Sequence, residues 1–229
     1  MAESQDNHPF EVTNVNQVKR VPKRGHYDRK TVFEIIDRAW IGHVGILNFH
    51  NEGVAVIPML HARMGDSLIF HGANSSRLMK YLSSGQSVSV SFAMVDGLVL
   101  AKSLFHHSMN YRSAVVFGTG KLLTDRSDVL AALKAISDKV MPGRWDDARQ
   151  PNEKEMSATA VVALQIESAS AKIRTGDPSD DEADLDFPAW TGIVPIVSTI
   201  GESITDPKSA DIQHPGYIDE FRNEFNAGC

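Results

Sequence analysis

The stretch that most constrains the fold is residues 95–125, VDGLVLAKSLFHHSMNYRSAVVFGTGKLLTD, where two β-rich runs flank a long polar segment. Asp96–Gly97 favours a turn, and Ala114–Thr124 is typical of a buried strand. Between them lies a polar crossover rich in histidine and serine, which ends in Tyr111–Ser113. Because strands fix the backbone and aim the polar side chains at their ends, this crossover predicts one wall of a ligand site.

Strand patterns lie on both sides of this stretch. In residues 86–95, apolar side chains alternate with small polar ones, a period of two that is typical of a half-buried strand. Further β-rich runs lie at 43–49 (HVGILNF), 53–59 (GVAVIPM), 66–72 (DSLIFHG) and 157–168. The sequence therefore predicts six or seven short strands, with a hairpin turn at residues 50–53.

Helical periodicity is confined to a few segments. Asp28, a good N-cap residue, precedes an amphipathic pattern that ends near Gly42. A second clear pattern spans residues 127–140 and stops at Pro142–Gly143. The remaining segments are a helical run at 78–82, an irregular polar connection at 144–155 and a terminal helix or tail at 217–225.

This order of elements favours a mainly β, α+β fold. Strands and helices do not alternate, and no G-x-G-x-x-G turn is present, so a doubly wound α/β fold is excluded. We expect an antiparallel closed or split barrel of six to seven strands with helices at its ends, because closure removes exposed sheet edges. Gly118 and Gly120 predict a bulge or a close backbone approach on one barrel strand. The polar residues 1–24 predict an extended N-terminal arm.

Charge and cysteine content narrow the function class. The formal net charge of −6, with short basic clusters only at residues 19–20 and 23–24, argues against nucleic-acid binding. The single cysteine, Cys229, allows no intramolecular disulfide and is typical of a reducing cytoplasm. No apolar run approaches the roughly 18 residues of a membrane span, and the first twenty residues lack the apolar core of a secretion signal. We therefore expect a cytoplasmic protein.

Asn74–Arg77, the sequence NSSR, follows a predicted strand and precedes a helical run. Backbone N–H groups at such a helix start, together with the Ser75 and Ser76 hydroxyls and the Arg77 guanidinium, could hold a phosphate. The simpler interpretation is an ordinary helix cap beside an exposed arginine.

Four histidines are candidates for chemistry. His106 and His107 are the catalytic candidates, as bases or substrate contacts, because histidine changes charge near neutrality. The alternative is a polar loop with two partly exposed histidines. His61 and His71 could face one pocket, where a histidine could serve as the axial ligand of a haem. No ligand-spaced carboxylates support a structural zinc site, so no metal site is assigned.

Five fragments in this order carry a resemblance to a known family: IPML (57–60), IFHGANSSR (69–77), residues 95–113, VVFGTGKLL (115–123) and PAWTGIVP (188–195). Together they resemble the pyridoxamine 5′-phosphate oxidase-like, FMN-binding split-barrel proteins, within them the flavin-nucleotide-binding or nitroimidazole-resistance-like branch. The resemblance covers about residues 25–197, which defines one FMN-binding split-barrel domain between the N-terminal arm and a C-terminal tail of residues 198–229.

The resemblance implies a homodimer with two FMN sites at its interface. The FMN phosphate would meet the turn from His71 to Arg77, and the isoalloxazine edge would lie along Val56–Leu60. The cofactor-binding residues are then Pro58, Met59, His71, Ser75, Ser76, Arg77, Tyr111, Arg112 and Ser113, with Trp190 covering the site from the second subunit. Pyridoxamine phosphate oxidases carry an arginine-and-lysine phosphate motif, whereas in this chain Leu78 follows Arg77. This difference argues against pyridoxamine phosphate as the substrate.

Two function classes follow. The first is an FMN-dependent oxidoreductase that acts on a small organic substrate, with NAD(P)H as a candidate electron donor. In such an enzyme the flavin carries the electrons, while the protein supplies orientation and excludes water. The second is a non-catalytic flavin- or haem-binding protein for storage, sensing or haem degradation. The visible spectrum of the purified protein separates flavin from haem.

Overall fold

The computed structural model describes residues 8–47 and 53–228. The strands are β1 (Gly25–His26), β2 (Ile41–Leu47), β3 (Val54–Leu60), β4 (Ala62–Met64), β5 (Ser67–Ala73), β6 (Ser87–Leu100), β7 (Ser108–Leu122), β8 (Thr159–Arg174) and β9 (Gly192–Pro195). The α-helices are α1 (Arg29–Arg38), α2 (Arg77–Leu82), α3 (Arg126–Val140), α4 (Arg144–Asp147), α5 (Glu153–Ala158) and α6 (Gly216–Ala227). Single 3₁₀ turns lie at Pro22–Arg24, Leu104–His106, Glu182–Asp184 and Pro207–Ser209.

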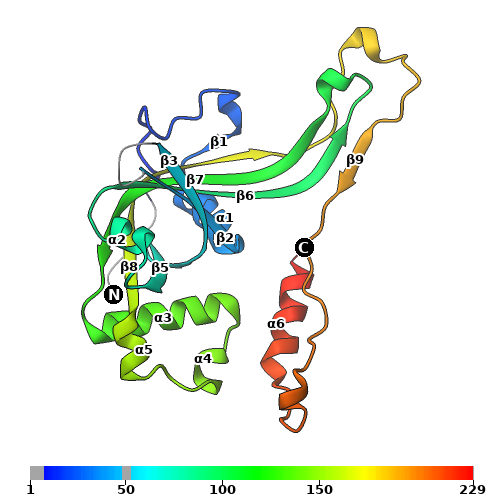
Figure 1. Ribbon diagram of the computed structural model, residues 1–229. Coiled ribbons are helices and arrows are strands. Elements are labelled where there is room, and N and C mark those ends of the chain that lie inside the picture. The colour runs from blue at the N-terminus through cyan, green and yellow to red at the C-terminus, as the bar shows by residue number, and fades with distance from the viewer. Residues whose placement is uncertain (1–7, 48–52, 229) are drawn as a thin grey trace.

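One antiparallel sheet curls into a split barrel (Figure 1), which confirms the predicted fold class. The strand order is β3-β2-β6-β7-β8-β5-β4, so β3 and β4 form the two edges, although His61 alone separates them in the chain. The chain therefore passes directly from one edge of the sheet to the other. His61 is buried at this seam, and its Nε2 donates to the Ile36 carbonyl at 3.0 Å.

Two apolar clusters lie on opposite faces of the sheet. The inner cluster joins the buried face of α1 to inward side chains of the long strands, for example Ile36 to Phe70 and Phe92. The outer cluster packs Ala132 and Ile136 of α3 against Ile69 of β5 and its neighbours. Because alternate residues of β5 enter different clusters, β5 is buried on both faces.

The glycines of β7 allow close backbone contacts, as predicted. The register between β7 and β8 shifts at Phe117/Gly118, which marks the bulge. A Cβ atom at Gly118 would lie 1.8 Å from the Gln165 carbonyl oxygen, and one at Gly120 would lie 2.1 Å from the Leu82 carbonyl oxygen. Only glycine fits these two positions without a backbone shift.

The stretch 95–125 differs from its prediction. Asp96–Gly97 is a bulge inside the continuous strand β6 and not a turn. β6 and β7 continue beyond the barrel as a long hairpin, whose tip is the 3₁₀ turn Leu104–His106 (Figure 1). Tyr111–Ser113 consequently lie within β7 rather than before a strand. We call this extension, together with the 175–195 segment beside it, the arm.

Several boundaries also differ. α1 begins at its Asp28 cap as predicted, but it ends at Arg38, and residues 41–47 form β2. The connection at 144–155, predicted as irregular, contains α4 and part of α5. The predicted turn at 50–53 lies mostly outside the described residues.

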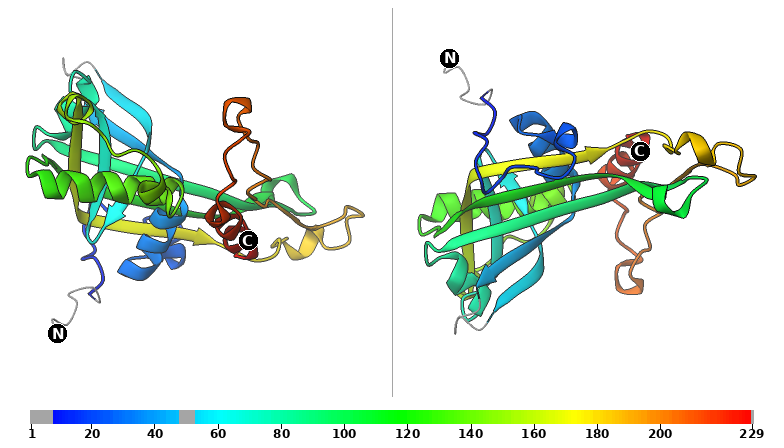
Figure 2. Two further views of the ribbon diagram at one scale, coloured as in Figure 1. Left: turned by 90° about the horizontal axis from the view of Figure 1, so that it is seen from below. Right: turned by 90° about the horizontal axis from the view of Figure 1, so that it is seen from above.

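The described parts of both end segments, predicted as an extended arm and a tail, pack against the barrel. In the N-terminal arm, Phe10 is buried, and the Asn16 amide donates to the Ala169 carbonyl at 3.1 Å. β9 pairs with β6 of its own chain, and α6 stands beside the barrel (Figures 1 and 2). The rings of Phe221 and Phe225 contact Trp40 at centroid distances of 6.4 and 6.0 Å. No helix in the described part of the chain is long and apolar enough to cross a bilayer.

Candidate functional site

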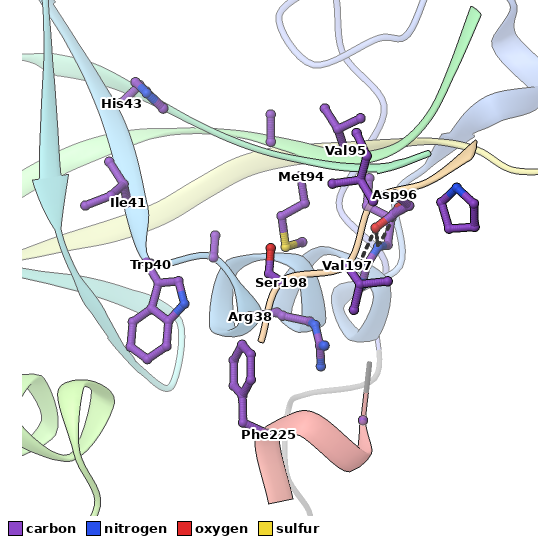
Figure 3. A pocket seen from close by; sticks show the side chains of 16 residues that line it. Arg38, Trp40, Ile41, His43, Met94, Val95, Asp96, Val197, Ser198 and Phe225 are labelled. Atoms are coloured by element: carbon purple, nitrogen blue, oxygen red, sulfur yellow. Dashed lines mark hydrogen bonds and ion pairs between the residues drawn. The ribbon is translucent and has the colours of Figure 1, made fainter. Parts of the chain in front are cut away.

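A cavity of about 470 Å³ lies where the C-terminal segment crosses the barrel wall (Figure 3). We call it the arm cavity. β2 contributes Ile41 and His43, β6 contributes Met94, which also packs against the inner cluster, with its neighbours, and residues 195–198 close the opposite side. The complete lining is Arg38, Ala39, Trp40, Ile41, His43, Ala93, Met94, Val95, Asp96, Arg112, Pro195, Ile196, Val197, Ser198, Phe225 and Gly228.

A charge pair in this lining joins neighbouring strands. Arg112 donates from Nη2 to one carboxylate oxygen of Asp96 at 2.6 Å and from Nε to the other at 3.0 Å. Both side chains are about one-third exposed. Such a fork-shaped contact holds the guanidinium in one orientation and neutralises much of its charge.

Tyr111, Arg112 and Ser113 do not converge on one site. Successive side chains of a strand point to opposite faces, so Arg112 faces the arm cavity, whereas Tyr111 and Ser113 lie on the other face of β7. The Ser113 hydroxyl donates to the Lys172 carbonyl at 3.1 Å, and Ser113 lines a separate cavity beneath the N-terminal arm.

The NSSR turn is an ordinary helix start with a basic side chain beside it. Ser76 is the N-cap of α2, and its hydroxyl oxygen accepts from the Met79 N–H at 3.5 Å. This leaves the hydroxyl proton available to another acceptor. The Arg77 side chain has no ion pair with any described residue. Tyr81 of the same helix contacts the Leu47 N–H, so α2 lies at the end of the barrel where β3 begins.

β3 offers an open edge near this turn. Among the described strands it pairs with β2 alone, and Pro58, which lacks an N–H, lies within it, as an edge strand tolerates. Met59 packs partly on the inner cluster, whereas Val54, Val56 and Pro58 are exposed. The unpaired edge presents backbone donors and acceptors to whatever lies beside it.

The other predicted residues lie on the arm. His106 Nε2 is 3.1 Å from an Asp181 carboxylate oxygen, and His107 Nε2 donates to the Ala101 carbonyl at 3.1 Å. Trp190 is two-thirds exposed. None of the three lines the arm cavity or any of three further cavities in the described part of the chain. The structure thus separates the predicted residues into the NSSR turn with the β3 edge, Arg112 in the arm cavity, and the arm itself.

His71 and His61 occupy different environments. His61 is enclosed in the inner core against Phe92, and burial lowers its pKa to about 4, so that it is neutral. His71 points from the other face of β5 into a second cavity, of about 490 Å³, between the sheet and helices α3, α4 and α5. We call it the helix cavity. Burial also lowers the pKa of His71.

The sequence prediction missed several residues of the arm cavity. Trp40, His43 and Phe225 come from the end of α1, from β2 and from α6, and they meet only after folding. One local signal was present, since β2 exposes Ile41, His43 and Leu47 on its outward face. An apolar outward face on a barrel strand indicates a contact surface.

The chain was compared with known proteins. Residues 28–173 match the family described as pyridoxamine 5′-phosphate oxidase. Among solved structures, the flavocytochrome Anf3 from Azotobacter vinelandii is 36% identical, with a TM-score of 0.85 over 92% of this chain and 97% of that one. The FAD and haem binding protein from Mycobacterium smegmatis is 29% identical, with a TM-score of 0.81 over 87% of this chain and 97% of that one.

A more distant likeness concerns the fold alone. A putative 5-nitroimidazole antibiotic resistance protein from Bacteroides thetaiotaomicron is 18% identical, with a TM-score of 0.54 over 65% of this chain and 86% of that one. None of the curated proteins matches the chain. The family match covers well over half of the chain and agrees with the split-barrel fold. This chain therefore belongs to the pyridoxamine 5′-phosphate oxidase family.

Proposed function

We propose that this protein is a flavin-dependent oxidoreductase that acts on a small organic substrate. The observation that carries the proposal is the likeness to a flavocytochrome at 36% identity over 92% of the chain. The Ser76–Arg77 turn and the open β3 edge support it, because both lie at one end of the same barrel wall.

The flavin phosphate meets Ser75, Ser76 and Arg77. α2 has only six residues, so the helix dipole contributes little, and the guanidinium of Arg77 with the free hydroxyl proton of Ser76 provides the binding energy. A charge-assisted hydrogen bond of this kind is worth about 1.5–3 kcal/mol.

The isoalloxazine ring lies along β3. The unpaired backbone groups beside Val56, Pro58 and Leu60 are available to the polar edge of the ring, which needs both donors and acceptors. When bound, the flavin accepts and donates the electrons. The chain's own residues bind it, orient it and exclude water from it.

A homodimer completes the site in this proposal. β2 and β3 expose apolar side chains on their outward face, among them Ile41, Leu47, Val54 and Val56, that a second copy would cover. Trp190, exposed on the arm, would then contribute to the partner's site. His106 and His107 lie on the arm. In this proposal they are the catalytic candidates that a partner subunit brings to the substrate.

FMN is the flavin that we propose, because one serine–arginine turn matches one phosphate. The Mycobacterium smegmatis protein binds FAD, by its description, so an experiment must distinguish FMN from FAD in this protein. The mass of the flavin released from the purified protein distinguishes them. NADH or NADPH is the proposed electron donor, and the cytoplasm is the proposed compartment, on the basis of the single cysteine.

Purification followed by absorption spectroscopy tests the proposal. Flavin bands in the protein as isolated or after reconstitution, and flavin reduction by NADH or NADPH, are the expected results. A protein that neither contains flavin nor takes it up would refute the proposal. A protein that binds flavin but shows no turnover with either nucleotide and an added acceptor would refute the enzymatic part.

A second candidate function is a non-catalytic carrier or sensor of flavin or haem. Two solved relatives favour it, one a flavocytochrome and the other an FAD and haem binding protein. Stable haem uptake without turnover would support this candidate.

A further inference from the structure

A cavity of about 290 Å³ lies beneath the N-terminal arm, and the flavin proposal does not use it. We call it the N-terminal cavity. Residues 15–20 of the arm form its roof, and outward side chains of β7 and β8, such as the paired Val115 and Ser170, form its floor. The neighbours Val116 and Ala169 enter the inner cluster, so this floor is the opposite face of the sheet.

The lining of the N-terminal cavity carries three cations and no carboxylate. Lys19 and Arg20 come from the N-terminal arm, and Lys172 comes from β8. None of the three makes an ion pair within the part of the chain that the structure describes. Such a grouping is unusual in a protein with a formal net charge of −6. Because like charges repel, an anion placed among them would be stabilising.

Ser170 adds an unpartnered hydroxyl to the floor. The residue is only 7% exposed, and its hydroxyl has no hydrogen-bond partner among residues 8–47 and 53–228. The oxygen is nevertheless accessible rather than sealed in the core, and Ser170 lines the cavity. Polar groups of buried residues are nearly always satisfied, so this hydroxyl indicates a hydrogen-bonding group in the cavity.

Hydrogen bonds hold the roof in place above β7 and β8. Asn16 is 3% exposed, and its amide donates to the Ala169 carbonyl at 3.1 Å, which anchors the N-terminal arm to β8. Two residues later, the Val18 N–H donates to the Tyr27 hydroxyl oxygen at 2.8 Å. The arm is therefore fixed on both sides of the cavity, and the basic pair that follows Val18 is held at its rim.

Val21, directly after the basic pair, has a strained backbone. Its φ of 54° lies in the left-handed region, which a branched side chain rarely adopts. The chain turns there, and Gly25 then pairs with Lys172 of β8. Strain of this kind persists where the surrounding structure enforces it and is found at ligand clamps. Here the turn keeps the arm cations beside the Lys172 side of the cavity.

We propose that the N-terminal cavity binds a small organic phosphate. The phosphate group contacts Arg20, Lys19 and Lys172, and one of its oxygens accepts from the Ser170 hydroxyl. A phosphate monoester carries nearly two negative charges and three strong acceptor oxygens, so it matches several cations and a hydroxyl better than a carboxylate does. A guanidinium among the cations adds paired, planar donors.

The organic part of the ligand packs on the apolar side of the lining. Val15 of the arm and Val115 and Phe117 of β7 provide that side. The volume of about 290 Å³ is at the small end of ligand sites, which hold roughly 300–1,000 Å³. We therefore expect a ligand smaller than a flavin nucleotide, bound apart from the flavin.

Calorimetric titration of the flavin-loaded protein with phenyl phosphate tests the proposal. With the flavin site filled, one phenyl phosphate should bind per chain, more tightly than inorganic phosphate or benzoate. Arg20→Ala and Lys172→Ala should each weaken binding at least about tenfold, as the loss of a charged hydrogen bond does. Ser170→Ala should weaken it about two- to tenfold. Lys23→Ala is the matched control, because it removes an exposed charge from the same arm outside the cavity.

Three results would overturn the assignment. They are a folded wild type that binds no phenyl phosphate, wild-type affinity in both Arg20→Ala and Lys172→Ala, and binding of benzoate as tight as that of phenyl phosphate. Flavin content should be unchanged in Arg20→Ala, and its loss there would merge this cavity with the flavin site. If the protein takes up no flavin, the same titration on Arg77→Ala, in which the proposed flavin phosphate site is disabled, still tests the N-terminal cavity alone.

Discussion

Asp96 and Arg112 face each other across β6 and β7, with two hydrogen bonds of 2.6 and 3.0 Å, at the position where β6 bulges. The bulge turns Asp96 toward the arm cavity, so the pair lies in the wall between barrel and C-terminal segment (Figure 3). Arg112 is thereby already matched to a carboxylate, which reduces its value as a binder of a second anion.

Arg112→Ala should therefore act mainly on stability. The pair is about one-third exposed, so we expect a loss of about 1 kcal/mol in the free energy of unfolding, at the upper end for exposed pairs. Flavin affinity should change less than in Arg77→Ala. A double-mutant cycle with Asp96→Asn, measured by urea unfolding, gives the coupling energy. A flavin loss in Arg112→Ala as large as in Arg77→Ala would contradict the division of roles.

Arg77→Ala should weaken flavin binding by about 1.5–3 kcal/mol, because a charged hydrogen bond to the phosphate is lost. Lys80→Ala is the matched control, since it removes a positive charge from the exposed side of the same helix. Fluorescence titration of the apoprotein measures both affinities. Equal affinities in Arg77→Ala and the wild type would remove Arg77 from the site.

Gly118→Ala should destabilise the fold strongly. Its Cβ would overlap the Gln165 carbonyl, so β7 and β8 must separate at the bulge, at a cost of about 3 kcal/mol or more. Gly216→Ala, with open space around it, should change the free energy of unfolding by about 0.5 kcal/mol at most. Thermal unfolding followed by circular dichroism compares them. A Gly118→Ala protein with wild-type stability would show that the bulge is easily rearranged.

The barrel could be predicted from the sequence because strands and helix caps are recognised from neighbouring residues alone. Alternation marks a strand such as β6 wherever its partner lies, and the Asp28 cap marks the start of α1. Aspartate and glycine favour turns, so Asp96–Gly97 predicts one from the sequence. The structure has a bulge there instead, in a segment that also pairs with β9, nearly a hundred residues later. A Cβ atom at Gly97 would lie 2.9 Å from a methyl carbon of Ile193.

The site was harder to predict for the same reason. Tyr111–Ser113 lie within β7, and neighbouring side chains of a strand point to opposite faces. These three residues are adjacent in the sequence, but their side chains therefore do not face one site. The helix cavity depends on α4 and α5, whose short helices carry little periodicity and lay in a segment predicted as irregular.

His61 predicts a pH dependence of stability. Its folded pKa is about 4 against an ordinary value of 6.5, so the unfolded chain binds a proton first as the pH falls. Stability should therefore decrease between about pH 6.5 and pH 4, by roughly 3 kcal/mol. The partly buried His71, whose pKa is lowered too, acts in the same direction. His61→Gln retains a donor for the Ile36 carbonyl without titrating, and its stability should fall less over this interval. Equal pH profiles for the two proteins in denaturant titrations would contradict this assignment.

Val56→Glu should dissociate the proposed homodimer. Val56 is 62% exposed on the apolar face of β2 and β3, and a carboxylate there would be buried without a partner if a second copy covered it. Val15→Glu is the matched control, because Val15 is 61% exposed but lies on the N-terminal arm. Light scattering should find a dimer in the wild type and Val15→Glu but a monomer in Val56→Glu. Since the partner completes the site, flavin affinity should fall with dissociation. A monomeric wild type, or a Val56→Glu protein that remains dimeric, would show that this face has another use.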